Sequence, residues 1–338
     1  MIFPKCLIGR KPFVTCHGYV LPCCWLDIPR YSTNGKVRNV DWELVDNIFL
    51  RPQFHLGTRT YVDIVTSDEW LLALEGLYMR RYHACEMKCS DYFMSDGAME
   101  HDEYKIDEML ISGTLQHKTD QQIFRQHQVD TFDVGIIQIE LTTRCNLKCP
   151  YCPRLTDKPQ KADLDISYAE DVLMSKKWDQ ISDVGNYGDS IFYTHYHEFL
   201  ELLVHADVDR YDAHIAATGR TQKWWDRTNE LYRKIINSGT AVTIYWGIDG
   251  LEDTSSKHRI GQNWHEIIDA MRGSADVGVE ATWQFIPMSF NEHQIETAQE
   301  LADEWGVAFQ IHPSCRFTKN DPNMPINPKL HRNFYNVR

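Results

Sequence analysis

The sequence predicts an α/β protein built around a parallel sheet. From about residue 134, six strand-like stretches alternate regularly with helix-like stretches. Regular alternation of this kind gives parallel strands joined by right-handed crossovers. The pattern alone leaves a barrel or partial barrel and a doubly wound open sheet both possible. In either architecture the active site lies at the carboxyl ends of the strands.

Each predicted strand is a short apolar or alternating run, and each predicted helix combines apolar periodicity with a start or stop signal. The expected strands cover residues 135–142, 179–185, 212–219, 241–249, 279–288 and 307–313. The expected helices cover residues 167–174, 197–206, 223–239, 263–273 and 291–306. Residue pairs with the spacing of helix N-caps are Ser167 with Glu170, Asn263 with Glu266 and Asn291 with Gln294. Gly239 is a typical helix stop.

Composition and charge are those of a soluble globular protein. The chain has 338 residues, a mean hydropathy of -0.46 and a formal net charge of -13. This length favours a long α/β domain plus a smaller module. No apolar stretch approaches the roughly 20 residues of a membrane span, and the first residues lack the apolar core of a secretory signal. We therefore expect a cytoplasmic protein without a membrane partner, and the negative charge disfavours broad binding to nucleic acid.

Ten cysteines in an apparently intracellular chain favour metal or redox chemistry over disulfides. Three of them, Cys145, Cys149 and Cys152, form a C-x-x-x-C-x-x-C pattern after the first predicted strand, in "LTTRCNLKCPYCPR". A structural zinc site or a fully ligated cluster takes four protein ligands. Three thiols with no fourth nearby indicate a metal coordination position that is left for another molecule. The alternative is a zinc site with a distant fourth ligand.

The segment "ELTTRCNLKCPYC" resembles the signature of the radical S-adenosylmethionine enzymes, including the aromatic Tyr151 before the last cysteine. The resemblance implies a 4Fe–4S cluster held by Cys145, Cys149 and Cys152, with S-adenosylmethionine bound at the fourth iron. It also implies a partial (β/α)6 TIM-like barrel over residues 134–316. In this family, reductive cleavage of S-adenosylmethionine yields a 5′-deoxyadenosyl radical, which abstracts hydrogen from the substrate. Such a cluster needs a low reduction potential.

Further segments match cosubstrate contacts of this family. "VGNYGDS" supplies Tyr187, Gly188 and Asp189 at the Gly-Gly-Glu type motif, with Tyr187 in place of the first glycine. A Gly- and Asn-rich turn is the alternative interpretation of this segment, and a surface arginine is the alternative for residue 259. Thr218 in "ATGR" is the candidate for the ribose region. Arg259 in "YWGIDGLEDTSSKHRIG" is the candidate for the cosubstrate carboxylate. Many relatives have a serine where this segment has a glycine, at residue 247.

Residues 1–95 resemble a SPASM/twitch auxiliary-cluster module, which here precedes the core. The resemblance implies an auxiliary 4Fe–4S cluster; its ligands would be Cys6, Cys23, Cys85 and Cys89, although Cys16 or Cys24 could replace one of them. Gly18 suits a tight turn with positive φ, and "LVDNIFLRPQF" resembles the helix of the module. A four-cysteine zinc site is the alternative. Residues 96–133 are expected to form a linker and residues 317–338 a C-terminal tail.

We therefore expect a radical S-adenosylmethionine enzyme. The resemblance implies a peptide, protein or small-molecule substrate and an electron donor such as flavodoxin or ferredoxin. Cys315 is a candidate to return a hydrogen atom to the substrate, with inert packing as the alternative. Gln138, Glu140 and Gln284 either line the substrate pocket or form buried polar pairs with backbone groups. The rival function is a non-catalytic zinc or iron–sulfur protein for binding or electron transfer.

Overall fold

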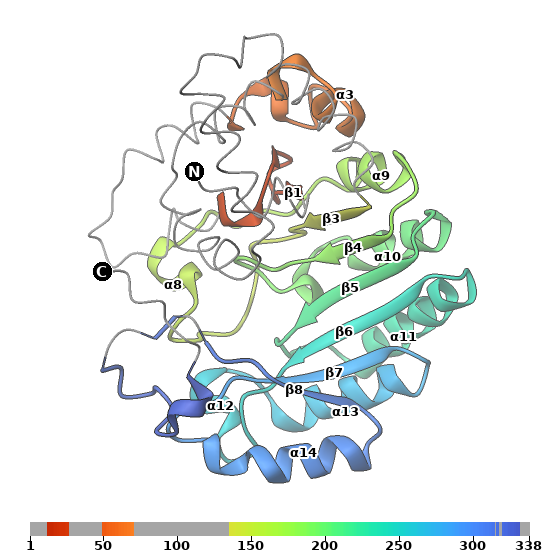
Figure 1. Ribbon diagram of the computed structural model, residues 1–338. Helices are drawn as coiled ribbons and strands as arrows, with labels where there is room; N and C mark the ends of the chain where they lie inside the picture. The colour runs from red at the N-terminus through yellow and green to blue at the C-terminus, as the bar shows by residue number, and fades with distance from the viewer. Residues whose placement is uncertain (1–11, 27–48, 71–134, 315, 318–319, 332–338) are drawn as a thin grey trace, which may run out of the picture. The chain divides into compact units, whose positions relative to one another are not determined.

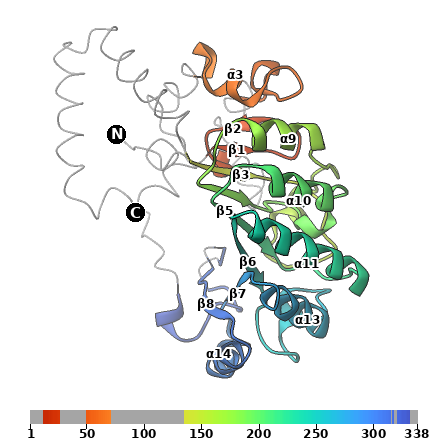
Figure 2. The ribbon, with the colours of Figure 1, turned by 90° about the vertical axis from the view of Figure 1, so that its right-hand side faces the viewer.

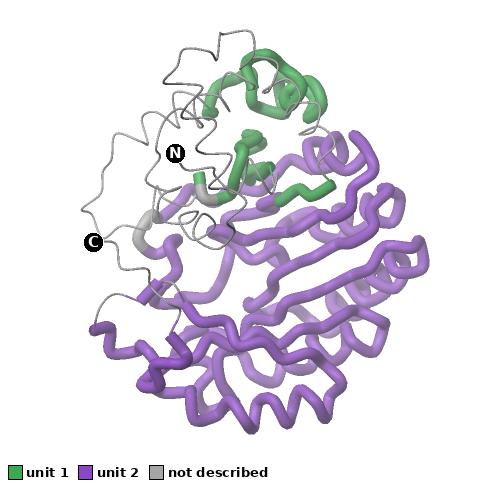
Figure 3. Tube along the Cα trace, viewed as in Figure 1, with its two compact units in different colours: residues 1–138 green, residues 139–338 purple. Residues whose placement is uncertain are grey.

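The protein has a mixed α/β fold. The computed structural model describes residues 12–26, 49–70, 135–314, 316–317 and 320–331. The chain divides into two compact units, residues 1–138 and 139–338 (Figure 3). In the second unit, hydrogen bonds pair five successive strands in parallel and in chain order (Figure 1): β4 (Gln180–Asp183), β5 (Arg210–Ile215), β6 (Ala241–Gly247), β7 (Glu280–Phe285) and β8 (Ala308–Ile311). The predicted α/β fold with a mostly parallel sheet is thereby confirmed, whereas the partial barrel and the cysteine-rich module stay predictions. Within the described ranges, no helix is long and apolar enough to cross a membrane.

The described part of the first unit consists of a short hairpin and a small helical segment. Its elements are β1 (Phe13–Val14), β2 (Val20–Leu21), η1 (Cys24–Leu26), η3 (Pro52–Phe54) and α3 (Tyr61–Val65). The hairpin is antiparallel, and Gly18 in its turn has a φ of 82°, as predicted for a residue without a Cβ. Phe49, Phe54 and Trp70 pack together with ring centroids 5.8–6.0 Å apart. The predicted linker, residues 96–133, lies outside the described residues.

Six strands follow in the chain, each at or near its predicted position: β3 (Ile136–Ile139), β4 (Gln180–Asp183), β5 (Arg210–Ile215), β6 (Ala241–Gly247), β7 (Glu280–Phe285) and β8 (Ala308–Ile311). The predicted helices are confirmed as α9 (Ile166–Met174), α10 (Tyr196–His205), α11 (Gln222–Asn237), α13 (Trp264–Ala275) and α14 (Ile295–Glu304). Shorter helical elements are α8 (Pro153–Asp157), α12 (Ser255–His258), η5 (Ser190–Phe192), η6 (Glu292–Gln294) and η7 (Pro328–Leu330).

Local hydrogen bonds explain where the helices begin and end. The Asn263 side chain accepts from the backbone N–H of Glu266 at 3.1 Å and caps α13, as predicted. At α9 the prediction is wrong about the cap. Asp165, and not Ser167, is the N-cap, and its Oδ1 accepts from the Ser167 N–H at 2.9 Å. Gly239, with a φ of 105°, follows the end of α11 as expected.

The core of the second unit lies between the sheet and one layer of helices. Trp225 of α11 packs on Trp246 of β6 at 5.7 Å between ring centroids, and Phe199 of α10 packs on Tyr211 of β5 at 6.0 Å. Figure 2 shows α10, α11 and α13 along the same side of these strands. Because side chains alternate along a strand, the polar residues between these apolar ones occupy the opposite face. They are Asp212, His214, Thr243, Tyr245, Thr282 and Gln284.

Candidate active site

Three cysteines lie in the loop between β3 and the start of α8. Cys149 is only 8% exposed, and Cys145 and Cys152 are half-buried. The backbone N–H of Cys152 donates to the carbonyl of Cys149 at 3.0 Å, which closes a tight turn. Cys152 is also the N-cap residue of α8, where Pro153 takes the first helical position. The Cys145 sulfur accepts from the N–H of Leu147 at 3.4 Å. All three thiols therefore lie between the end of β3 and the N-terminus of α8.

Burial and nearby charges raise the pKa of two of the three thiols. Burial raises the pKa of Cys145 to about 12, and the Asp189 carboxylate adds to this effect. Burial also raises the pKa of Cys149, where Arg259 acts in the opposite direction and Cys152 adds to the increase. Metals bind the thiolate, so a cation is needed to stabilise the ionised form here. Among the described residues, no group of three or more Cys, His, Asp or Glu side chains is arranged to hold a metal ion. The cluster ligands stay a prediction.

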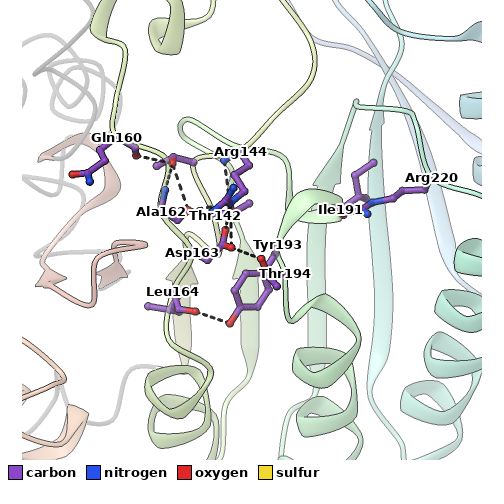
Figure 4. A network of polar contacts seen from close by, with 11 residues as sticks. Thr142, Arg144, Gln160, Ala162, Asp163, Leu164, Ile191, Tyr193, Thr194 and Arg220 are labelled. Carbon is purple, nitrogen blue, oxygen red and sulfur yellow. Dashed lines mark hydrogen bonds and ion pairs between the residues drawn. The ribbon is translucent and has the colours of Figure 1, made fainter.

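A carboxylate outside the loop fixes the residues that precede the first cysteine (Figure 4). Asp163 accepts from the Thr142 hydroxyl at 2.6 Å, from Arg144 Nε at 3.0 Å and from the Thr194 hydroxyl. Burial opposes ionisation of Asp163, but the hydrogen bonds from Thr142, Thr194 and Arg144 outweigh it and lower the pKa of the carboxyl. Asp163 is therefore an ionised anchor for the start of the cysteine loop.

Side chains and backbone groups beyond β5 and β6 hold the middle of the cysteine loop. Asn146 Nδ2 donates to the carbonyl of Thr218 at 2.5 Å, and the N–H of Lys148 donates to the carbonyl of Ile260 at 2.8 Å. The Thr218 hydroxyl accepts from the N–H of Asn263 at 3.1 Å. Thr218, the predicted ribose contact, is 2% exposed and joins the cysteine loop to the start of α13. Its contact with a cosubstrate stays a prediction.

The predicted residues 187–189 form a packed connection beside the cysteine loop. The N–H of Tyr187 donates to Oε1 of the buried Glu140 at 2.9 Å. The glycine at 188 makes a close approach possible, because a Cβ there would overlap the backbone carbonyl of Thr142. Asp189 Oδ2 accepts from the backbone N–H groups of Ala216 and Ala217, both at 2.8 Å. Loops after three neighbouring strands are therefore hydrogen-bonded to one another, and the Asp189 carboxylate faces backbone donors.

Arg259, the predicted partner of the cosubstrate carboxylate, lies in a buried ion pair. Its Nε donates to Asp249 Oδ2 at 2.6 Å. A Cβ at residue 247 would lie 2.8 Å from Arg259 Nη2, so the glycine there leaves room for the guanidinium. Sequence spacing pointed to Arg259 but not to Asp249.

Tyr151, the predicted aromatic contact of the cosubstrate, is bound to a segment near the C-terminus. Its hydroxyl donates to Asp321 Oδ1 at 2.6 Å and accepts from Asn323 Nδ2 at 2.9 Å. Its ring meets Phe317 edge-on at 5.2 Å between centroids, and Arg316 donates to its carbonyl at 2.9 Å. Burial and the bond to Asp321 raise the pKa of Tyr151 to about 12. The phenol is therefore neutral and held in place.

A comparison with protein families decides the class of this site. Residues 139–303 match the family model described as the radical SAM superfamily. The match covers just under half of the chain and indicates a radical SAM superfamily domain in these residues. The matched range contains the three cysteines of the loop as well as Asp163, Asp249 and the α/β units that hold them. A domain of this superfamily implies a 4Fe–4S cluster and reductive cleavage of S-adenosylmethionine, and it supports an enzyme with radical chemistry. It does not favour the rival interpretation as a non-catalytic zinc protein.

Several solved structures are similar to this chain at low identity. Streptococcus suis SuiB bound to S-adenosylmethionine has a TM-score of 0.45 and 13% identity, covering 67% of this chain and 54% of SuiB. SuiB bound to the precursor peptide SuiA has a TM-score of 0.45 and 14% identity, covering 63% and 51%. Native anSMEcpe with bound AdoMet has a TM-score of 0.43 and 16% identity, covering 57% and 56%. The chain thus spans about half the length of these proteins. Among curated proteins, none matches this chain in sequence.

The cysteines that precede the radical SAM domain are only partly described. Cys16 is buried in the hairpin turn that contains Gly18, and Cys23 and Cys24 are half-buried after β2. Three of the predicted auxiliary ligands, Cys6, Cys85 and Cys89, lie outside the described residues, as does Cys315. The auxiliary ligand set therefore stays a prediction.

Sequence reasoning missed several residues that shape the radical SAM domain. Asp249 stands just beyond β6, at the carboxyl edge of the sheet, and that position was a usable signal. Asp163 lies in an irregular stretch and gives no comparable signal. Glu266 was noted for its cap spacing, but its Oε1 also accepts from the N–H groups of Gly219 and Arg220, at 2.5 and 2.9 Å. These acceptors fix the loops around the cysteines.

Proposed function

We propose that this chain is an enzyme that cleaves S-adenosylmethionine at a 4Fe–4S cluster held by Cys145, Cys149 and Cys152, and that it abstracts hydrogen from a substrate. The observation that carries this proposal is the presence of three thiols, and no fourth cysteine, within the part of the chain that matches the radical SAM superfamily. When bound, the cluster would supply one electron to the sulfonium of S-adenosylmethionine. The residues of the chain bind, orient and shield these groups.

A buried acceptor beside the cysteine loop supports binding of a polar ligand. Gln262 donates through Nε2 to the carbonyls of Ala216 and Gly247, at 2.7 and 2.9 Å. Its Oε1 is buried and has no hydrogen-bond partner among the described residues. A buried acceptor without a partner is costly, so a donor from a ligand would stabilise it. Hydroxyl or amino groups of an adenosyl moiety have this character. We propose that Gln262 and Thr218 face that moiety, with Tyr151 and residues 187–189 nearby.

The face of strands β5 to β8 opposite α10, α11 and α13 has the polar character of a substrate-binding surface. His214 and Tyr245 stack at 4.8 Å between ring centroids, and Gln284 Nε2 donates to Gln310 Oε1 at 3.0 Å. Desolvation by the surrounding protein, and then His312, lower the pKa of His214 to about 4, although part of the His214 side chain is solvent-exposed. We propose that a neutral, hydrogen-bonding part of a peptide, protein or small-molecule substrate lies on this face. Glu140 is instead engaged by a backbone N–H, as the alternative interpretation predicted.

The remaining predicted groups belong to the same proposal. Cys6, Cys23, Cys85 and Cys89 would hold an auxiliary 4Fe–4S cluster, with Cys16 or Cys24 as possible replacements. That cluster would accept an electron from the product radical or anchor the substrate. Cys315 would return a hydrogen atom to a substrate radical, and a flavodoxin or ferredoxin would reduce the first cluster. A zinc ion in the first unit remains the alternative to the auxiliary cluster.

Anaerobic reconstitution of the full chain with iron and sulfide tests the proposal. We expect about four irons for each cluster, hence about eight per chain if both form. Addition of dithionite and S-adenosylmethionine should release 5′-deoxyadenosine. Cys149→Ala should abolish this release, whereas His265→Ala, at an exposed position of α13, should leave it unchanged. Zinc in place of iron, together with intact S-adenosylmethionine, would refute the proposal.

The substrate and the auxiliary site need separate measurements. Incubation with deuterium-labelled candidate substrates should transfer deuterium into 5′-deoxyadenosine when the right carbon is labelled. Cys85→Ala should retain part of the cleavage of S-adenosylmethionine but stop product formation. Complete loss of cleavage in that variant would argue against a separate auxiliary function.

A further inference from the structure

Asp183, the last residue of β4, is a buried carboxyl group with a weak hydrogen bond. It is 0% exposed, and its Oδ2 accepts from the Tyr211 hydroxyl at 3.3 Å. A hydroxyl that donates to an ionised carboxylate normally lies closer, at about 2.5–2.7 Å. The other oxygen, Oδ1, has no hydrogen-bond partner among the described residues. These contacts suit a neutral carboxyl group better than a carboxylate.

Two other buried aspartates of the same unit have the donors that Asp183 lacks. Asp249 is 0% exposed and accepts from Arg259 Nε at 2.6 Å and from the backbone N–H of Ile286 at 2.8 Å. Asp189 is 5% exposed and accepts from two backbone N–H groups beyond β5, both at 2.8 Å. Among the described residues, neither a cation nor a backbone N–H donates to Asp183. A buried charge without such donors is costly, and the group takes up a proton instead.

The surroundings of Asp183 contain further acids. Asp183 is paired with Ala213 of β5, two residues after Tyr211, and so lies on the same face of the sheet as Tyr211. The titratable groups that interact electrostatically with Asp183 come from the two ends of η5 and from β5, α10 and α11: Asp189, Tyr193, Tyr196, Tyr211 and Tyr232. None of these five groups is a cation, so none of them would neutralise an ionised Asp183.

This environment changes the acidity of the group. Burial raises the pKa of Asp183 from 3.8 to about 7, while Ser190 and Tyr211 act in the opposite direction and Asp189 adds to the increase. The folded state therefore binds this proton more tightly than the unfolded state. The stability that protonated Asp183 contributes is complete below about pH 4 and is lost as the pH rises through 7.

The segment that follows Asp183 contains a donor that an ionised carboxylate could use. Residues 184–189 form an irregular connection, which is tied to β3 by the N–H of Val184, a donor to the Ile139 carbonyl at 2.9 Å. Asn186 is 7% exposed, and its Nδ2 has no hydrogen-bond partner among the described residues. A buried acceptor and a buried donor, both without partners, therefore lie three residues apart. Pairing them would stabilise a charge on Asp183, and it requires the connection to move.

We propose that Asp183 is a proton-binding site between the sheet and its helices, and that loss of this proton to water loosens the connection of residues 184–189. This connection packs against the start of the cysteine loop, since Gly188 lies close to the Thr142 carbonyl. Ionisation of Asp183 thereby makes the geometry beside the cysteine loop depend on pH. The inference goes beyond the proposed function and requires no cofactor in the loop.

Infrared spectroscopy of the full chain tests the protonation state. A protonated carboxyl group has a C=O stretching band that a carboxylate lacks. Because exposed Asp and Glu side chains are ionised at about pH 6, we expect a remaining band at that pH, which disappears with a midpoint at about pH 7. Asp183→Asn should remove this titrating band. Asp179→Asn, at an exposed position just before β4, is the matched control and should retain it.

Tyr211→Phe keeps the carboxyl group and removes the hydroxyl that donates to it. Because that donor favours the ionised form, the midpoint of the band should move to higher pH. This variant keeps the test decisive if Asp183→Asn fails to fold. A midpoint that stays unchanged in Tyr211→Phe, or a band that remains in Asp183→Asn, overturns the inference.

Hydrogen exchange followed by mass spectrometry tests the loosening of the connection. The wild type and Asp183→Asn are compared at the same pH, so the intrinsic effect of pH on exchange cancels. Peptides that cover residues 184–189 should exchange several-fold faster in the wild type at about pH 8.5 and equally fast in both proteins at about pH 6. Peptides from α13 are the internal reference and should exchange equally in both proteins at each pH.

The outcomes separate this inference from the proposed function. Equal exchange of residues 184–189 in both proteins at both pH values overturns the inference. If Asp183→Asn does not fold, Tyr211→Phe replaces it, and the faster exchange should then begin at a higher pH than in the wild type. Neither measurement depends on iron or on S-adenosylmethionine. A chain that fails to cleave S-adenosylmethionine would therefore overturn the proposed function and leave this inference standing.

Discussion

The hydroxyl of Tyr151 donates a hydrogen bond of 2.6 Å to the carboxylate of Asp321, 170 residues further along the chain. The segment that carries Asp321 is itself attached beyond β7, where the Ser289 hydroxyl donates to the carbonyl of Pro322 at 2.8 Å. Tyr151, which lies between Cys149 and Cys152 in the cysteine loop, is therefore linked to the last described segment of the chain.

Tyr151→Phe removes this link and keeps the aromatic ring. We expect the free energy of unfolding to fall by about 1 kcal/mol, as for a typical hydrogen bond. Asp321→Ala should have a similar effect, and the double variant should be scarcely less stable than either single variant. Urea unfolding of the three variants measures this coupling. Strictly additive effects would show that the bond contributes nothing.

Gly188→Ala should destabilise the protein because of close packing. The new methyl group would overlap the backbone carbonyl of Thr142, and backbone atoms give way less easily than a side chain. Overpacking of this kind costs about 1–3 kcal/mol. Gly273→Ala is the control, since its methyl group meets only the end of the Asn229 side chain and the helix gains from alanine. Equal melting temperatures for the two variants would contradict this explanation.

Asp249 should make the free energy of unfolding depend on pH in the acidic range. Burial opposes its ionisation, but Arg259 outweighs burial and lowers the pKa of the carboxyl from 3.8 to about 2. The folded state therefore binds the proton less tightly than the unfolded state. The stability that Asp249 contributes is complete above about pH 4 and is lost as the pH falls toward 2, an effect on the order of 2 kcal/mol.

Asp249→Asn provides the comparison. It leaves Arg259 as a buried cation without its carboxylate, so we expect a loss of about 3–5 kcal/mol near neutral pH. Between about pH 5 and pH 3 its unfolding free energy should fall less than that of the wild type, because one proton-binding group is gone. Unfolding by urea at several pH values measures both curves. Parallel curves would exclude Asp249 as the source of the acid sensitivity.

Asp163→Asn should loosen the start of the cysteine loop. The amide keeps one oxygen acceptor but loses the charge that binds Arg144 and the Thr142 and Thr194 hydroxyls, at a cost of about 1–3 kcal/mol. We expect faster alkylation of Cys145 in the apoprotein, measured by mass spectrometry of the modified peptide. Asp226→Asn, whose side chain bonds only to Gln222 within α11, is the control. Equal alkylation rates in both variants would contradict an anchoring function.

The order of strands and helices in the second unit was predictable because it depends on short-range periodicity. Buried strands and amphipathic helices repeat over two and 3.6 residues, and these repeats are visible in a single sequence. Cap positions were less certain. Asn291 had cap spacing, but its side chain binds the carbonyls of Asp249 and Ile286 at 3.0 Å instead. The partners of the Asn291 side chain depend on where distant residues lie after folding, and the spacing of residues 291 and 294 gives no information about that.

The candidate site was predictable to the extent that its chemistry is local. The spacing of Cys145, Cys149 and Cys152 identified the thiols, and strand ends indicated the edge where they lie. The acceptors that fix them were not identified, because Asp163 and Asp249 act through contacts formed only after folding. Residues 187–189 were predicted to contact the cosubstrate; in the structure they contact the backbone of neighbouring loops, and the ligand contact stays a prediction.

The Asp189 carboxylate has a consequence for protein engineering. It accepts from the backbone beyond β5, while its own N–H donates to the carbonyl of Arg144 at 2.9 Å. A graft of the cysteine segment alone onto another α/β scaffold would lose both neighbours and leave their polar groups unsatisfied. A functional transplant would have to carry the three connecting segments after β3, β4 and β5 as one piece.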